Sequence, residues 1–145
     1  MGMRDNALVF SDAQAVTTAT ATASTNVLDM AAARDVSKGQ PLYLNIVVNT
    51  TVQASGGAAN VTFALITDDN VSFSSGTTLW TSAAIAKATL VAGYRVIRMS
   101  LPENCERYIK VQYTPDTNDL TAGKFDAWLS INVDDRKIYP KNYAV

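Results

Sequence analysis

The fold of this chain is decided by residues 90–133, which read LVAGYRVIRMSLPENCERYIKVQYTPDTNDLTAGKFDAWLSINV. Apolar and polar side chains alternate in three segments of this stretch, 94–101, 107–114 and 124–133. A period of two residues is typical of antiparallel strands with one buried face. The stretch therefore predicts three successive β-strands. The side chains expected to face the core are Ile97, Met99 and Leu101 in the first segment, Ile109, Val111 and Tyr113 in the second, and Phe125, Ala127, Leu129, Ile131 and Val133 in the third.

Shorter apolar runs precede this stretch, and residues 42–49 and 60–67 show the clearest further alternation. Gly, Pro, Asn and Asp separate the runs, and such residues favour turns. About eight short strands with almost no helix predict an all-β protein, a jelly-roll-like antiparallel β-sandwich with extended terminal segments.

Three parts are expected along the chain. Residues 1–25 are predicted to form an N-terminal arm, which can include an edge strand. Residues 26–138 are predicted to form the β-sandwich domain, and residues 139–145 a C-terminal tail. The Thr/Ala alternation of 17–25 buries little and specifies strand register weakly. This tract is either an extended arm that is ordered by a partner or an ordinary edge strand of the same domain.

The composition restricts the classes of function. The chain of 145 residues is 48% hydrophobic, carries a formal net charge of −1, and contains no basic run, so a nucleic-acid partner is not expected. It has no histidine, which is the commonest general base and the usual zinc ligand. The one cysteine, Cys105, lacks a histidine to activate it and is interpreted as a bystander thiol.

The acidic residues do not form a recognisable catalytic or metal-binding motif. They occur as Asp68-Asp69, as Asp116 with Asp119, and as Asp134-Asp135, all at predicted turns where carboxylates cap backbone N–H groups. We therefore expect no enzymatic activity, no cofactor and no metal. No apolar run approaches the ~20 residues of a spanning helix, and no signal peptide is recognised. We therefore expect no membrane contact, and we expect synthesis in a cytoplasm.

Aromatic side chains on predicted strands allow one further function. Trp80, Tyr94, Tyr108 and Trp128 lie on or beside strands, and Trp128 falls on the polar face of its strand. Aromatics that share one sheet face can stack on sugars, as in many carbohydrate-binding β-sandwich modules. The competing interpretation is that a second sheet or a subunit covers these side chains.

Several short motifs resemble, in their order and spacing, the phage capsid cement proteins of the Bordetella-phage type. The resemblance covers nearly the whole chain from about Phe10. The motifs are Ser11-Asp12-Ala13-Gln14-Ala15-Val16, Leu90-Val91-Ala92-Gly93-Tyr94-Arg95, Tyr108-Ile109-Lys110-Val111-Gln112-Tyr113, Thr121-Ala122-Gly123, Ala127-Trp128-Leu129 and Tyr139-Pro140.

The resemblance implies a non-enzymatic decoration protein that is made in the host cytoplasm and lies on the outer surface of the phage head. It would clamp neighbouring major capsid protein subunits against internal DNA pressure and would be a homo-oligomer, a dimer or a trimer. The N-terminal segment is expected to supply capsid contacts, so that deleting residues 3–25 leaves a folded domain that no longer binds heads. Residues expected at capsid or subunit contacts are Phe10, Thr20, Thr22, Trp128, Tyr139 and Tyr143. The alternative to a decoration protein is a carbohydrate-binding β-sandwich module of a phage tail spike or fibre.

Overall fold

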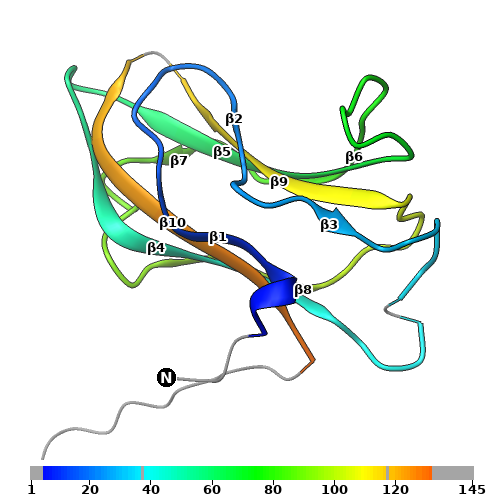
Figure 1. Ribbon diagram of the computed structural model, residues 1–145. Helices are drawn as coiled ribbons and strands as arrows, with labels where there is room; N and C mark the ends of the chain where they lie inside the picture. The colour runs from blue at the N-terminus through cyan, green and yellow to red at the C-terminus, as the bar shows by residue number, and fades with distance from the viewer. Residues whose placement is uncertain (1–4, 37, 117, 132–145) are drawn as a thin grey trace, which may run out of the picture.

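The computed structural model describes residues 5–36, 38–116 and 118–131. They form two antiparallel sheets that pack face to face (Figure 1). Sheet A has the order β1-β10-β4-β8, and sheet B has the order β2-β9-β5-β6, with β3 also paired to β9 and β7 also paired to β5. The elements are η1 (Asn6–Leu8), β1 (Val9–Ala15), β2 (Thr22–Ala23), β3 (Leu28–Asp29), β4 (Tyr43–Ala54), β5 (Asn60–Asp68), β6 (Thr77–Thr81), β7 (Ile85–Ala86), β8 (Arg95–Ser100), β9 (Tyr108–Pro115) and β10 (Leu120–Ser130).

The topology confirms the predicted jelly roll. Strands β2 and β3 lie one after the other along β9, and β6 and β7 lie one after the other along β5, so the ten strands occupy eight positions. Apart from the β5–β6 hairpin and the links β2–β3 and β6–β7, which stay within sheet B, each connection crosses from one sheet to the other. This is the double-sheet arrangement of a jelly roll.

The three strands expected from 90–133 are present, although they do not pair with one another. In β9, Ile109, Val111 and Tyr113 are all 0% exposed, as their alternation predicted. Strand β10 starts at Leu120, four residues earlier than predicted, and ends at Ser130. Ile131 is 48% exposed instead of facing the core, and Val133 lies outside the described residues.

Three aromatic rings form the centre of the core between the sheets. Phe63 of β5 and Tyr113 of β9 come from sheet B, and Phe125 of β10 comes from sheet A. The Phe125 ring lies 5.2 Å from each of the other two ring centroids, edge-on to Phe63 and stacked on Tyr113. Such pairs stabilise a core beyond the area that they bury.

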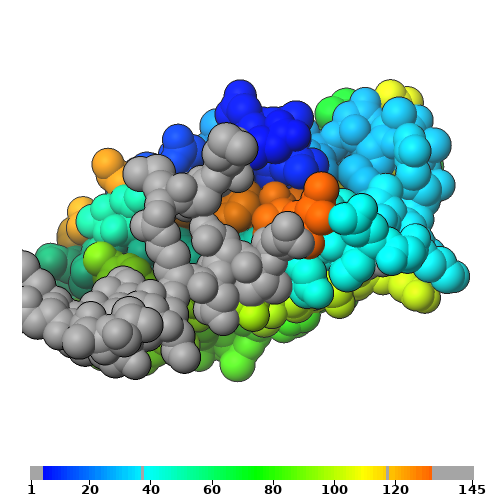
Figure 2. Space-filling view, turned by 90° about the horizontal axis from the view of Figure 1, so that it is seen from below, coloured from blue at the N-terminus to red at the C-terminus, as the bar shows by residue number. Residues whose placement is uncertain are grey.

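The N-terminal residues belong to this core and do not form an arm outside the domain. Strand β1 pairs with β10, and Phe10 and Val16 are 0% and 1% exposed. Figures 1 and 2 show this segment lying directly against β10, blue beside orange. The expected boundary between an arm at 1–25 and a domain from residue 26 therefore needs correction, because residues 9–16 supply buried apolar side chains. Residues 1–4 and the predicted tail at 139–145 lie outside the described residues.

An irregularity in β1 is held by a carboxylate from β10. Ala13 has a φ of 46°, which a residue with a side chain adopts at a cost. Its N–H donates to Asp126 Oδ1 at 2.6 Å, and Asn49 Nδ2 donates to the other carboxylate oxygen at 3.1 Å. Asp126 thus fixes the register shift of β1 between Ser11 and Gln14, and a second shift lies between Val9 and Ser11, around the fully buried Phe10.

Candidate functional site

The Thr/Ala tract forms an anchored loop and an edge strand, the second of the two interpretations of its sequence. Residues 17–21 are exposed, and the following Thr22 and Ala23 pair with Tyr113 and Gln112 of β9. The loop is tied to the opposite connection by Ala19 N–H, which donates to Asp119 Oδ1 at 2.7 Å. Since Asp119 belongs to the same chain, this hydrogen bond positions the loop without help from a partner protein.

Gln14 joins β1 to the far end of the same tract. Its Nε2 donates to Ala23 O at 2.8 Å, and its Oε1 accepts from Thr25 N–H at 2.8 Å and from Ser11 Oγ at 2.6 Å. Ser11 Oγ in turn accepts from the buried Tyr113 hydroxyl at 2.8 Å. A chain of hydrogen bonds therefore runs from the core to the Thr/Ala loop and restrains that end of the sandwich. In the sequence, nothing distinguishes Gln14 from an ordinary polar strand residue.

The structure places the predicted contact residues in different environments. Phe10 is buried in the core, so its prediction as a contact residue is wrong. Thr20 is exposed on the loop, and Thr22 is half-buried in β2. Tyr139 and Tyr143 lie outside the described residues.

Trp128 lies on the outer face of sheet A. It is half-buried and stands between Ala127 and Leu129, which both point into the core. Its register neighbours are Val9 on β1 and Asn45 on β4. Trp128 is therefore a large amphipathic side chain on an outer sheet face, and its role as a contact residue stays a prediction.

The sugar-stacking platform required by the carbohydrate-binding alternative is not formed. Trp80 belongs to β6 in sheet B, whereas Trp128 belongs to β10 in sheet A. Both Trp80 and Tyr94 pack as partly buried side chains against the core. The three aromatics therefore do not share one sheet face.

The β5–β6 connection is a loop built around the Asp68 carboxylate. This side chain is 0% exposed and accepts from Asn70 N–H at 3.0 Å and Ser75 N–H at 2.9 Å. The Asn70 side chain accepts in turn from Ser72 N–H at 3.0 Å. In the sequence, Asp68-Asp69-Asn70 and Ser74-Ser75-Gly76 appear as two separate turn signals, and only the fold brings Asp68 and Ser75 together.

The same loop displays an apolar tip. Val71 is 60% exposed at the turn. Phe73 has a left-handed φ of 53°, and its ring lies 4.2 Å from the ammonium of Lys110 on β9. This cation–π contact fixes the loop to the outer face of sheet B. The tip is therefore a positioned apolar contact point.

Asp68→Ala is expected to lower the melting temperature by several degrees, because two backbone N–H groups lose their acceptor. Hydrogen bonds from those N–H groups hold the pKa of Asp68 below its ordinary value of 3.8, against the effect of burial. A lowered pKa stabilises the fold above the ordinary value, and this contribution is lost as the pH falls through the folded-state pKa. Thermal unfolding of wild type and variant between pH 7 and pH 2 measures it. Asp12→Ala, which removes an exposed carboxylate, is the control, and an equal effect of both variants would contradict the assignment.

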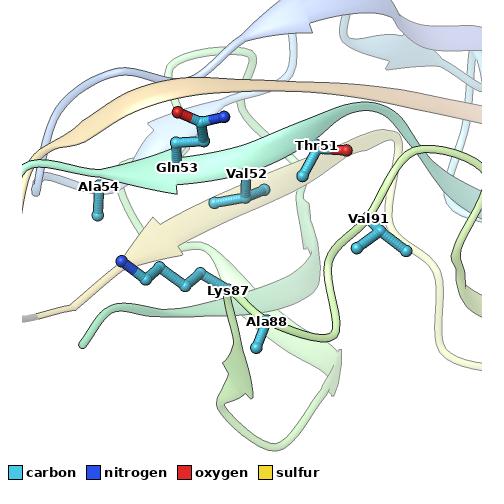
Figure 3. A pocket seen from close by; sticks show the side chains of 7 residues that line it. All are labelled: Thr51, Val52, Gln53, Ala54, Lys87, Ala88 and Val91. Carbon is cyan, nitrogen blue, oxygen red and sulfur yellow. The ribbon is translucent and has the colours of Figure 1, made fainter. Parts of the chain in front are cut away.

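A recess opens beside the last third of β4 (Figure 3). It measures about 310 Å³ and is lined by Thr51, Val52, Gln53, Ala54, Lys87, Ala88 and Val91. The Lys87 ammonium donates to Gly56 O at 3.0 Å, and Val91 is 47% exposed at the rim. One cation among mainly apolar side chains makes this recess a candidate contact point for an acidic side chain.

Metal binding, membrane spanning and thiol reactivity can be assessed within the described residues. No group of three or more His, Cys, Asp or Glu side chains is placed to hold a metal ion, and no helix there is long and apolar enough to cross a membrane. Burial, with a smaller contribution from Asp35, raises the pKa of Cys105 to about 11. Its thiol therefore stays protonated at neutral pH and is a weak nucleophile.

The fold and its surfaces define a class of protein, an all-β jelly-roll sandwich whose candidate sites are loops and faces suited to contact with other proteins. The model of the Bbp16 family matches residues 10–129. The chain therefore belongs to this family, which is a Bordetella phage protein family, and it is a phage structural protein and a virion component. The resemblance found in the sequence is thus confirmed at the level of the family. No curated protein matches the chain.

Proposed function

We propose that this protein is a capsid cement, or decoration, protein that binds the outer surface of a phage head. It clamps neighbouring major capsid protein subunits and so stabilises the head against internal DNA pressure. The observation that carries the proposal is the Bbp16 match over residues 10–129 on a chain that folds as one jelly roll.

The rigidity of the sandwich supports a mechanical role. Side-chain acceptors fix the connections at several places: Asp119 holds the Thr/Ala loop, Asp68 holds the β5–β6 loop, and Asp116 accepts from Asn60 N–H at 2.8 Å. A clamp made of pre-positioned loops loses little conformational entropy when it binds. Each contact can then be modest, because linked contacts gain avidity of order 10²–10⁴.

The proposed partner is the major capsid protein, and the decoration protein itself acts as a homo-oligomer, either a dimer or a trimer. Nucleic acid, membrane, cofactor and catalysis have no part in this role. Thr20, Thr22 and Trp128 remain proposed contact residues, and Val71 and the Lys87 recess join them on the evidence of their exposure and position.

Cosedimentation with phage heads tests the function. The purified chain is expected to sediment with expanded, undecorated heads and to bind unexpanded heads at least about tenfold more weakly, which corresponds to ~1.4 kcal/mol. The physical reason is that expansion changes the spacing of the shell subunits that a clamp must span. Decorated heads are also expected to resist heat and osmotic shock better than bare heads. Absence of binding to expanded heads at saturating protein would contradict the proposal.

A further inference from the structure

The edge of sheet B formed by β6 and β7 has an open side. Strand β6 pairs with β5 from Thr77 to Thr81, and β7 continues along β5 at Ile85 and Ala86. Ser82 links the two, since its N–H donates to Phe63 O at 2.8 Å. Within the described ranges, no strand pairs with the other side of β6 or β7. The backbone groups on that side are therefore available to a further strand.

This edge lacks the charges that the edge strands β1, β3 and β8 carry. Residues 77–86 read TTLWTSAAIA and contain neither a charged residue nor a proline. By contrast, β1 carries an exposed Asp12, β3 carries Asp29, and β8 carries Arg95 and Arg98, whereas the two-residue β2 is uncharged as well. Charges and prolines on edge strands normally prevent pairing with other chains. A neutral edge that contains three threonines, Trp80 and Ile85 favours pairing.

The edge is also held in place before any partner arrives. Leu79 and Trp80 pack against the core from β6, and the Asp68 carboxylate fixes the loop that leads into this strand. Thr78, opposite Ile66, is exposed. Such a preformed edge binds an added strand with little ordering cost on its own side.

We propose, building on the proposed function, that an extended segment of a neighbouring shell subunit adds as a strand to β6. Another extended backbone matches a row of alternating backbone donors and acceptors along its whole length, which is the mode known as β-augmentation. Because β6 offers no charge, the added segment is expected to be neutral and rich in β-branched residues.

The short length of β6 favours a shell subunit, and not a second copy of this chain, as the source of the added strand. Five residues at about 3.4 Å each span only about 17 Å. Pairing over that length buries a few hundred Å², well below the ~1,200–2,000 Å² of a stable interface. Such a contact is too small to hold a dimer by itself, but it contributes when several contacts act together on a lattice.

Hydrogen–deuterium exchange on the full chain tests the proposal directly. The amides of Thr77–Thr81 that point away from β5 are expected to exchange at least about tenfold more slowly when the protein is bound to expanded heads than when it is free. Amides of the central strand β9, which already pair on both sides, serve as the internal reference and are expected to change little. Side-chain contact alone would not protect the β6 backbone in this way.

A charge placed on the edge gives the second measurement. Thr78→Lys adds the lysine that normally guards edge strands and is expected to weaken binding to expanded heads by at least about tenfold. Thr121→Lys makes the same charge change at an exposed position of β10 and is expected to bind within about twofold of wild type. Melting temperatures show whether both variants fold, and the exchange experiment on wild type is independent of them.

The outcomes are distinct. Head binding without protection of Thr77–Thr81, or equal binding by the two folded lysine variants, overturns the strand addition and leaves the proposed function standing. If the β6 amides of the free protein become protected from exchange as the protein concentration rises, the added strand comes from a second copy of this chain. That result overturns the proposal of a shell subunit. Failure of the unaltered chain to bind any heads overturns the proposed function and this inference with it.

Discussion

Deletion of residues 3–25 is expected to abolish folding, contrary to the outcome predicted for a separable arm. The deletion removes β1 with the buried side chains of Phe10 and Val16. It also removes Ser11 Oγ, which accepts from the buried Tyr113 hydroxyl. Loss of large buried apolar side chains costs roughly 2–5 kcal/mol each, and the total is comparable with the ~5–15 kcal/mol stability of a whole domain. Circular dichroism and thermal unfolding of the truncated chain measure the effect.

A loop replacement is the matched control for this deletion. Exchange of residues 17–21 for Gly-Ser-Gly-Ser-Gly keeps β1 and β2 and retains the backbone N–H at position 19 that donates to Asp119. Because these five side chains are exposed, the variant is expected to fold with a melting temperature close to that of wild type. A truncated chain that unfolds as cooperatively as this control would show that β1 is dispensable.

Phe125→Ala is expected to destabilise the protein by about 3–5 kcal/mol, the usual cost of a large cavity in a core. Its ring is 0% exposed and lies 5.2 Å from both Phe63 and Tyr113. The substitution therefore removes the contacts that join sheet A to sheet B at the centre. Chemical denaturation at pH 7 gives the free energy of unfolding.

Phe73→Ala provides the comparison on the surface. It removes a ring of the same size from a half-buried loop position and is expected to cost about 1 kcal/mol, mainly the cation–π contact with Lys110. If Phe125→Ala and Phe73→Ala lowered the free energy of unfolding equally, the conclusion that Phe125 joins the two sheets at the centre of the core would be contradicted.

The strands themselves were largely predictable, because alternation is a local property of the chain. The inward side chains of β9 follow directly from a period of two residues. The start of β10 was missed because Thr121-Ala122-Gly123 carries no apolar alternation, yet these residues pair irregularly with β4. The Thr/Ala tract could not be assigned from sequence, since its small side chains fit an arm and an edge strand equally well.

The candidate site was less predictable than the fold. Phe10 was expected at a contact because it lies close to the N-terminus, and only the pairing of β1 with β10 places it in the core. The roles of Gln14 and Asp68 depend on partners that the sheets bring together, such as Ala23 and Ser75. No spacing rule in the sequence connects these pairs.

By itself, the sequence determined that this protein is an all-β chain whose strands have one apolar and one polar face. It also determined that the chain has no histidine and resembles Bordetella-phage proteins. Such features depend on composition and on neighbours within a few residues. The tertiary structure alone decided that the N-terminal residues complete sheet A, that Trp80 and Trp128 lie in different sheets, and that β6 is an uncharged open edge among the described residues. The physical reason is that strand order and edge exposure arise from pairing between distant segments, which the alternation of one strand does not encode.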